Sequence, residues 1–329
     1  MRIVKVGAIQ PHVLIPPPSC NCLSDAYTAD PKTILEDNVL PQLELNLAIL
    51  GQAGCRGLDI VTTSEDICAL SGYLIDTSSD CLFPDLAALS AAYVEEKISV
   101  LAKKYGMYII ACYFKPIDGK VYNVAAIFNR AGAICGFYKK THLPPNELWQ
   151  VRAGDDVPVF DLDFGRIGIE ICYDMMFPAL SEALSLAGVE IVFHPTGGYG
   201  WYDSIGEATL RTRANDGSFY LVTAKNHCGM NAGKSSVIDY WGQVLADAGF
   251  YENTLVWREI DLDIPKTQPS WFYQTGMSGE ARVRVRHETE RRPELYKALC
   301  APLTREQKAP DIETQEKLRE QVKKGLLHW

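Results

Sequence analysis

The sequence has no long apolar run and no excess of basic residues. No segment approaches the roughly 18 uninterrupted apolar residues that a membrane-spanning helix needs. Lys5 interrupts the apolar stretch at residues 1–10, which favours a first strand over a secretory signal peptide. The net charge is −9, whereas surfaces that bind nucleic acids or anionic membranes need a basic footprint. We therefore expect a cytoplasmic protein with neither nucleic-acid nor membrane partners.

The sequence also lacks the motifs of the common nucleotide, serine-hydrolase and zinc sites. It has no glycine-rich dinucleotide or phosphate-binding loop and no Gly-x-Ser-x-Gly elbow. The ten cysteines and six histidines are dispersed, without a CxxC pair or a His/Cys spacing typical of zinc. Without a secretory signal, scattered cysteines indicate a reduced setting. We expect no cofactor and no metal.

Strand-like and helical patterns alternate along most of the 329 residues. Helical spacing covers residues 40–54, 86–106, 178–188 and 207–216. Strand patterns cover residues 1–10, 57–66, 107–114, 121–140 as a pair, 158–172 as a hairpin, 191–198, 219–226, 234–240 and 254–263. In the 178–188 helix, the apolar spacing predicts a buried face of Leu180, Ala183, Leu184 and Ala187. Crossovers mixed with hairpins predict a mixed sheet, or two packed sheets, covered by helices.

No linker divides this pattern, so we expect one domain over residues 1–300. The proline-rich segment 14–36 is predicted to be a loop at the rim of an active site. Residues 301–329 form a charged tail with apolar residues at rough helical spacing. Such a tail is either a solvated helix or an arm laid on another subunit.

Cys172 is the candidate nucleophile, because it follows a buried-strand alternation and precedes a helix. A free thiol has a pKa of about 8.5, and handing its proton to an ordinary glutamate is uphill by roughly 6 kcal/mol. A working pair therefore needs a desolvated carboxylate and a nearby cation. Glu65 and Lys140 also end predicted strands, where sites collect in α/β proteins. The sequence thus offers an acid, a cation and a nucleophile at three strand ends.

Several motifs together resemble the nitrilase superfamily of carbon–nitrogen hydrolases. They are GFYKKTHLPPNE, then PVFDLDFGRIGIEICYDMMFP, and later HPTGG and GKSSVIDYWGQVLADAG. The resemblance covers residues 2–263 and implies an α/β fold, the four-layer α-β-β-α sandwich of that family. It also implies a homodimer or higher homo-oligomer, in which the C-terminal tail is an inter-subunit arm.

The resemblance also implies residue roles. Glu65 matches the general base, Lys140 the oxyanion-stabilising cation and Cys172 the nucleophile. Glu147 matches a second active-site glutamate, which positions substrate or water. The backbone N–H of Tyr173 matches the second oxyanion donor.

Two neighbouring residues compete for these roles. Lys139 precedes Lys140, and strand alternation points the two side chains to opposite sides, so only one faces the site. Glu170 shares its strand phase with Cys172 and is either the base or a supporting group.

Four other residues keep two interpretations each. His142 and His194 are either catalytic groups or ordinary buried histidines. Tyr199 and Trp201, after the HPTGG stretch, either line a substrate pocket or pack in the core.

The sequence departs from the family pattern at two places. Thr63 and Ser64 replace a common Phe-Pro before the base. Because polar neighbours solvate a carboxylate better, the pKa of Glu65 is expected to be raised less than it would be beside Phe-Pro. Ala179 and Glu182 replace a common Glu and Arg after the nucleophile. An ion pair is therefore expected to be missing there.

Tyr173 and Asp174 after the cysteine resemble the amidase and N-carbamoyl hydrolase branches, whereas true nitrilases tend to have Trp there. We expect hydrolysis of a small non-peptide amide through a cysteine thioester, releasing ammonia or an amine. N-carbamoyl hydrolysis, nitrile hydrolysis and acyl transfer are the alternatives within enzymes. A catalytically silent scaffold is the alternative outside them.

Overall fold

The structure is a computed structural model of the whole chain. It describes residues 1–14, 30–74, 82–148, 150–198, 203–227, 233–264, 291–300 and 317. Tyr199, Trp201, residues 15–29 of the proline-rich segment and all of the 301–329 tail except residue 317 lie outside the described residues.

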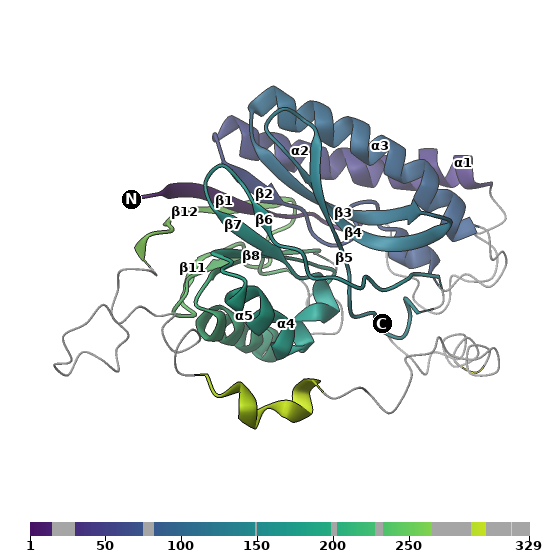
Figure 1. The fold of residues 1–329 in the computed structure, drawn as a ribbon. Helices are drawn as coiled ribbons and strands as arrows, with labels where there is room; N and C mark the ends of the chain where they lie inside the picture. Colours follow the sequence, from purple (N-terminus) through teal and green to yellow (C-terminus); the bar gives the residue numbers. More distant parts are fainter. Residues whose placement is uncertain are drawn as a thin grey trace.

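Two six-stranded sheets form the centre of the molecule (Figure 1). The first has the order β12-β1-β2-β3-β4-β5 and the second has the order β11-β10-β9-β8-β7-β6. The first sheet comprises β1 (Ile3–Gln10), β2 (Ile60–Thr62), β3 (Tyr108–Ile117), β4 (Lys120–Phe128), β5 (Ile134–Lys139) and β12 (Thr254–Asp261). The second comprises β6 (Phe160–Asp161), β7 (Arg166–Ile169), β8 (Ile191–Thr196), β9 (Tyr220–Lys225), β10 (Ser236–Ile238) and β11 (Val244–Asp247).

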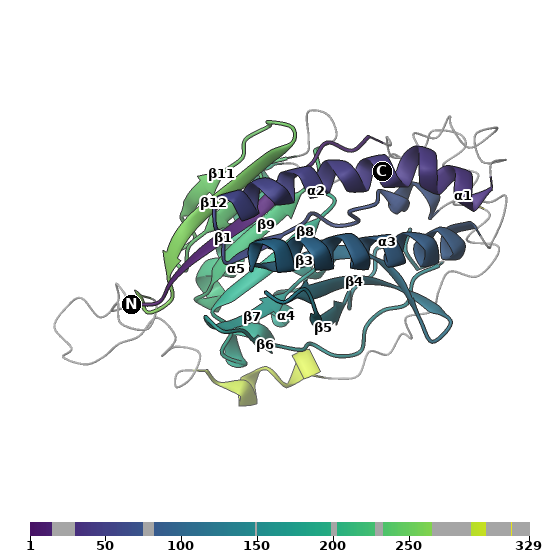
Figure 2. The same ribbon diagram turned by 90° about the horizontal axis from the view of Figure 1, so that it is seen from above.

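Helices cover the outer face of each sheet. The pair α2 (Leu40–Cys55) and α3 (Leu82–Tyr105) runs side by side over the first sheet (Figure 2). The pair α4 (Pro178–Leu186) and α5 (Asp203–Gly217) covers the second. Short α1 (Pro31–Ile34) continues through a π-helical turn, Leu35–Val39, into α2. The described residues also form 3-10 helices at Leu70–Tyr73, Cys172–Met176, Pro293–Leu295 and Lys297–Cys300.

Three apolar cores separate these four layers. The middle core lies between the sheets and includes Ile110 and Ile127 from one side and Ile167 and Ile169 from the other. A second core joins α2 and α3 to the first sheet, and a third joins α4 and α5 to the second. The predicted four-layer α-β-β-α sandwich is confirmed.

The parallel strands bring distant loops to one edge of the sandwich. β1, β2 and β3 are parallel to one another, as are β7, β8 and β9. The carboxyl ends of parallel strands meet at the same edge of a sheet, and loops there commonly carry functional groups. A backbone hydrogen bond from His227 N–H to Pro11 O at 2.8 Å joins the two edges across the sandwich.

Two local expectations are wrong. Residues 31–36 of the expected 14–36 loop are helical, because Asp30 caps α1 by accepting hydrogen bonds from Lys32 N at 3.0 Å and Thr33 N at 3.2 Å. Proline at the first helical position also suits this start.

The buried face of α4 is also rotated from the expected one. It consists of Leu180, Ser181, Leu184 and Ser185, whereas Ala183 and Ala187 are exposed. Both serines are accommodated because each hydroxyl donates a hydrogen bond of 2.7 Å, Ser181 to Glu170 and Ser185 to Gly217 O. None of the helices in the described ranges has the length and apolarity needed to span a bilayer.

Candidate active site

Glu65 lies in the turn after β2, with its carboxylate fully engaged in hydrogen bonds. Oε1 accepts from Asn123 Nδ2 at 2.9 Å and from Lys140 Nζ at 2.8 Å. Oε2 accepts from the backbone N–H of Gly197 at 2.8 Å. Glu65 is only 6% exposed. Its buried carboxylate is therefore held by donors from both sheets and not by solvent.

The ionised form of Glu65 is favoured despite its burial. Burial raises the pKa of the carboxyl group, but the Lys140 ammonium and the hydrogen bonds it receives outweigh this and lower the pKa below its ordinary value. The expected elevation of the Glu65 pKa is therefore wrong, because the neighbouring cation dominates over desolvation.

Lys140 follows β5 directly and is completely buried. Its ammonium donates to Glu65 Oε1 at 2.8 Å and to Glu147 Oε1 at 2.5 Å. Burial lowers the pKa of Lys140, but the carboxylates of Glu147 and Glu65 outweigh this and raise it well above its usual value. Neighbouring Lys139 faces the other way, with its Nζ over the ring of Tyr122 at 4.9 Å.

Glu147 is the less satisfied of the two carboxyl groups on Lys140. Its Oε2 is buried and has no hydrogen-bond partner among the described residues. Burial raises the pKa of Glu147 to about 7; the Lys140 ammonium opposes this rise and the Glu65 carboxylate adds to it. Glu147 is thus the group in this cluster whose charge changes near neutral pH.

Cys172 begins the 3-10 helix Cys172–Met176 with an unusual backbone conformation. Its φ is +48°, in the left-handed region, which costs a residue with a Cβ about 1–2 kcal/mol. The thiol interacts with the Glu65 carboxylate and the Thr196 hydroxyl. Burial, followed by the Glu65 charge, raises the pKa of Cys172 to about 12, although Lys140 opposes the rise. The resting sulfur is therefore a thiol.

Tyr173 is the second residue of this 3-10 helix. Its ring packs edge-on against Phe177, with ring centroids 5.4 Å apart. Because the first N–H groups of a helix have no acceptor within the helix, the backbone N–H of Tyr173 can serve a ligand. Tyr199 and Trp201, the other predicted pocket residues, lie outside the described residues.

His194 contacts the backbone of Cys172. Its Nε2 lies 3.2 Å from the carbonyl oxygen of Cys172, and its Nδ1 lies 3.0 Å from Thr223 Oγ1. Since a carbonyl only accepts, Nε2 carries the proton. Burial lowers the pKa of His194 to about 4, which keeps the ring neutral. This geometry makes His194 a positioning residue.

Asp174 ties the nucleophile turn to the strand that carries the lysine. Oδ2 accepts from Tyr138 Oη at 2.7 Å and Ile171 N at 2.9 Å. Oδ1 accepts from Thr141 Oγ1 at 2.9 Å and the backbone N of His142 at 2.8 Å. Burial raises the pKa of Asp174, but hydrogen bonds from the His142 and Tyr138 side chains and the Ile171 N–H, with the Lys140 charge, outweigh it and lower the pKa. This supporting role of Asp174 was not predicted, although the residue follows Cys172 by two positions in the GRIGIEICYDMMFP stretch.

The polar residues before Glu65 do not solvate its carboxylate. Ser64 is fully buried and donates to Asn226 Oδ1 at 2.6 Å, while Asn226 Nδ2 donates to the backbone oxygen of Glu65 at 3.1 Å. The Thr63 hydroxyl donates to the backbone oxygen of Ser64 at 2.9 Å. These hydroxyl groups therefore fix the turn, a role that the sequence pattern did not indicate.

Glu170 points away from the sulfur, toward the helix layer. Oε1 accepts from Ser181 Oγ at 2.7 Å, whereas buried Oε2 has no hydrogen-bond partner among the described residues. Burial raises the pKa of Glu170 to about 8. This environment does not suit a general base for Cys172, because the carboxyl group is held by Ser181 of α4 and retains its proton at neutral pH.

Replacing Glu170 by glutamine is expected to change how stability depends on pH. Because the pKa is raised from 4.5 to about 8 in the folded state, folded Glu170 holds a proton that the unfolded chain loses between these values. Wild-type stability should therefore fall, relative to Glu170→Gln, by about 1.4 kcal/mol per pH unit from pH 5.5 to 7.5. Urea unfolding at three pH values measures this. An unchanged difference would contradict the prediction, and exposed Glu44→Gln on α2 is the control.

Ala179 and Glu182 cannot form the ion pair that the family pattern has after the cysteine, as expected. Glu182 instead makes an ion pair with Arg291, whose Nε lies 2.9 Å from Glu182 Oε1.

His142, the other candidate base, stacks on Phe177 with ring centroids 3.8 Å apart and places Nδ1 2.9 Å from Asp174 Oδ1. His142 thus contacts the supporting aspartate.

Comparison with known proteins supports the same assignment of fold and family. The sequence profile of carbon–nitrogen hydrolases matches residues 43–265. The omega-amidase NIT2 of Bos taurus is 32% identical over 235 residues, covering 65% of this chain and 80% of that protein. The structure of Nit3 from Saccharomyces cerevisiae, in branch 10 of the nitrilase superfamily, is 20% identical, with a TM-score of 0.61 over 79% of this chain and 90% of that one. An amidase structure from Nesterenkonia sp. is 18% identical, with a TM-score of 0.65 over 90% and 96%.

Proposed function

Because the chain belongs to the carbon–nitrogen hydrolase family, we propose that it is an amidase that cleaves a small non-peptide amide through a thioester on Cys172. The observation that carries this proposal is the buried cluster of Glu65, Lys140 and Glu147, whose Glu65 carboxylate also contacts the Cys172 thiol. A protonated thiol beside an ionised carboxylate and a fixed ammonium is the arrangement that acyl transfer needs.

In the proposed first step, the carboxylate of Glu65 takes the proton of Cys172 as the sulfur attacks the amide carbon. Because the pKa of the thiol is raised to about 12, a free thiolate is scarce, and proton transfer accompanies attack. Two of the three protons on the Lys140 ammonium are committed to carboxylates, which leaves one for the developing oxyanion. The backbone N–H of Tyr173 supplies the second donor.

In the proposed second step, the tetrahedral intermediate collapses. Glu65 gives its proton to the leaving nitrogen, the carbon–nitrogen bond breaks, and ammonia or an amine departs. A water molecule then gives a proton to Glu65 and attacks the thioester carbon. The carbon–sulfur bond breaks, the acid leaves, and the sulfur regains the proton from Glu65. Each proton is returned, so no cofactor is consumed.

Glu147 is assigned the positioning of water or of the substrate nitrogen, as an ionised acceptor. Since burial raises the pKa of Glu147 to about 7, its ionised fraction increases through neutrality. We expect kcat/KM of the wild type to rise with pH to a plateau above pH 7, and Glu147→Gln to remove this inflection. A Glu147→Gln profile that keeps the inflection would assign it to another group.

Relatives named omega-amidases support an amide as the substrate, so small amides that carry a second carboxyl group are the first substrates to test. The panel also contains aliphatic and aryl amides, N-carbamoyl amino acids and nitriles. Released ammonia is measured, and the acyl adduct is weighed by intact-mass spectrometry of the quenched enzyme. Peptide mapping must place the adduct on Cys172.

The outcomes separate the alternatives. Ammonia without acid, in the presence of an added amine or hydroxylamine, identifies acyl transfer. If the enzyme turns over only N-carbamoyl compounds or only nitriles, that compound class replaces amides as the proposed substrate. A protein that forms no adduct with any compound, and whose Cys172 is inert to iodoacetamide, is a silent scaffold.

A further inference from the structure

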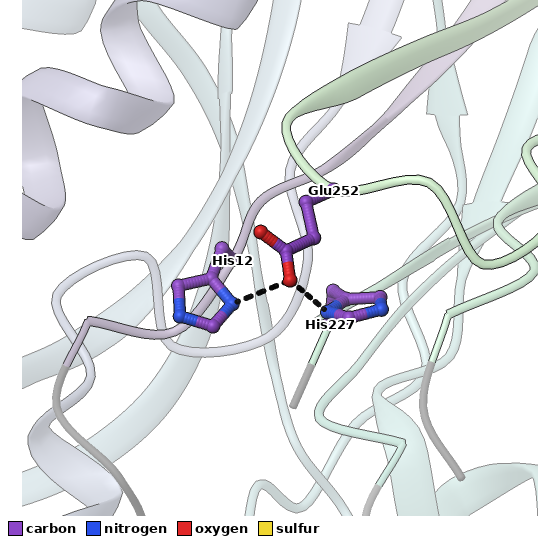
Figure 3. A group of neighbouring side chains, drawn as sticks. All are labelled: His12, His227 and Glu252. Atoms are coloured by element: carbon purple, nitrogen blue, oxygen red, sulfur yellow. Dashed lines mark ion pairs between the residues drawn. The ribbon is translucent and has the colours of Figure 1, made fainter. Parts of the chain in front are cut away.

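Three side chains that are far apart in the sequence meet outside the candidate active site. His12 follows β1, His227 follows β9, and Glu252 precedes β12. Figure 3 shows the two imidazole rings on either side of the Glu252 carboxylate. The Nδ1 atoms lie 3.6 Å (His12) and 3.5 Å (His227) from the same oxygen, Oε1 of Glu252.

Hydrogen bonding does not explain this arrangement. An N–H···O hydrogen bond spans about 2.7–3.2 Å, so both nitrogen–oxygen distances are too long. Both Nδ1 atoms are buried and have no hydrogen-bond partner among the described residues. The side chain of His227 is only 10% exposed. Buried polar atoms without a partner are uncommon and require an explanation, of which a bound ion is one.

The distances fit a tetrahedral metal ion. Two ligand atoms that each lie about 2.1 Å from a tetrahedral ion are separated by about 3.4 Å, close to the observed 3.5 and 3.6 Å. All three ligand atoms lie within 4.8 Å of one another.

The backbone beneath these side chains is fixed by hydrogen bonds. His12 and His227 form a parallel β-bridge, in which Val13 N–H donates to His227 O at 3.0 Å. Gln10 Nε2 donates to the carbonyl oxygens of Gly249 at 3.0 Å and Tyr251 at 2.8 Å, which holds the turn before Glu252. The three ligands therefore come from a rigid support, which favours metal binding.

We propose that the side chains of His12, His227 and Glu252 are the ligands of a divalent transition-metal ion, and that this ion is zinc. Two imidazole nitrogens and one carboxylate are donors that Zn²⁺ accepts, whereas Mg²⁺ and Ca²⁺ prefer oxygen ligands alone. Three protein ligands leave the fourth tetrahedral position for water or a small anion. The dispersed sequence positions explain why no zinc spacing is visible along the chain.

The ion would link the two sheets beside the candidate active site. His12 and Glu252 adjoin β1 and β12 of the first sheet, and His227 adjoins β9 of the second. His227 also follows Asn226, which holds the backbone of Glu65. Zinc is therefore assigned a stabilising and positioning role at this edge, separate from the chemistry at Cys172.

Equilibrium dialysis of the full, untagged chain against ZnCl₂, after chelator treatment, tests the site. We expect one zinc per chain, and at least tenfold weaker binding in each of His12→Gln, His227→Gln and Glu252→Gln. Zinc should raise the melting temperature of the wild type and not of these variants. Glu259→Gln on β12 is the matched control and should bind zinc as the wild type does. MgCl₂ should produce no stabilisation.

CoCl₂ as a probe distinguishes this site from the cysteines. Cobalt held by histidine and carboxylate gives weak visible bands, whereas cobalt on a thiolate adds intense near-ultraviolet charge transfer. Zinc binding that survives in all three ligand variants, or that Cys172→Ala alone removes, would overturn the proposal. If His227→Gln does not fold, the more exposed His12→Gln and Glu252→Gln still decide it.

Discussion

Replacing Cys172 by alanine is expected to reduce turnover by at least about 10⁴-fold, as loss of a nucleophile does in other hydrolases. The variant removes the sulfur that forms the proposed thioester, while Glu65, Lys140 and Glu147 stay in place. Substrate should still bind, so the effect falls on kcat rather than KM. Ammonia release and adduct formation are measured on the same preparation, with substrate binding followed by calorimetry.

Cys135→Ala is the matched control, because Cys135 is an exposed thiol on β5, away from the carboxylate cluster. It should retain full activity and the same adduct mass. If Cys172→Ala turned over substrate at the wild-type rate and with the wild-type pH dependence, the proposed mechanism would be ruled out. An unfolded Cys172→Ala is not expected, since alanine fits the same space and keeps the backbone.

Replacing Lys140 by methionine is expected to damage both stability and activity. The change leaves the carboxyl groups of Glu65 and Glu147 buried together without their shared cation. Removing one partner of a buried ion pair typically costs about 3–5 kcal/mol. Loss of the oxyanion donor should reduce kcat by a further 10²–10³-fold, in line with about 3–4 kcal/mol for one such donor. Urea unfolding and kcat are measured on the same protein.

A double variant separates the two effects. Lys140→Met with Glu147→Gln removes one of the stranded charges, so part of the stability should return while kcat stays low. Lys139→Met is the control, because Lys139 is partly exposed and packs over Tyr122, and should change stability by less than about 1 kcal/mol. If activity returned together with stability, Lys140 would be a structural cation alone.

Local periodicity could predict the helices and strands, whereas the four-layer arrangement and the roles of the central residues were implied by the family resemblance. Strand phase turns Lys140 inward and Lys139 outward, and the alternation of Ile167 and Ile169 marks a strand buried on the face toward the other sheet. The strand ends then place Glu65 near Lys140 once the sheet order is known. The same logic, applied to distant strands, places Cys172 on the facing sheet.

The rest depends on contacts between segments that are distant in the sequence. Ser181 and Ser185 are buried on α4 because acceptors from elsewhere meet their hydroxyl groups, so an apolar pattern could not identify that face. Asn226 likewise acquires a role only when its loop reaches the Glu65 turn. The pKa of Glu65 is lowered by one ammonium, which outweighs desolvation. This balance depends on distances that periodicity does not contain.

Glu65 and Lys140 follow strands of the first sheet, whereas Cys172 follows a strand of the second. The apolar layer between the sheets therefore acts as a spacer between these groups. Its thickness, set by side chains such as Ile110, Ile127 and Ile169, determines how far the sulfur stands from the acid. Packed sheets stand about 10 Å apart, and close-packed interiors respond to the loss of a single methylene. If the proposed mechanism holds, we expect a core substitution that changes this thickness to change the rate, although the substituted residue does not touch the substrate.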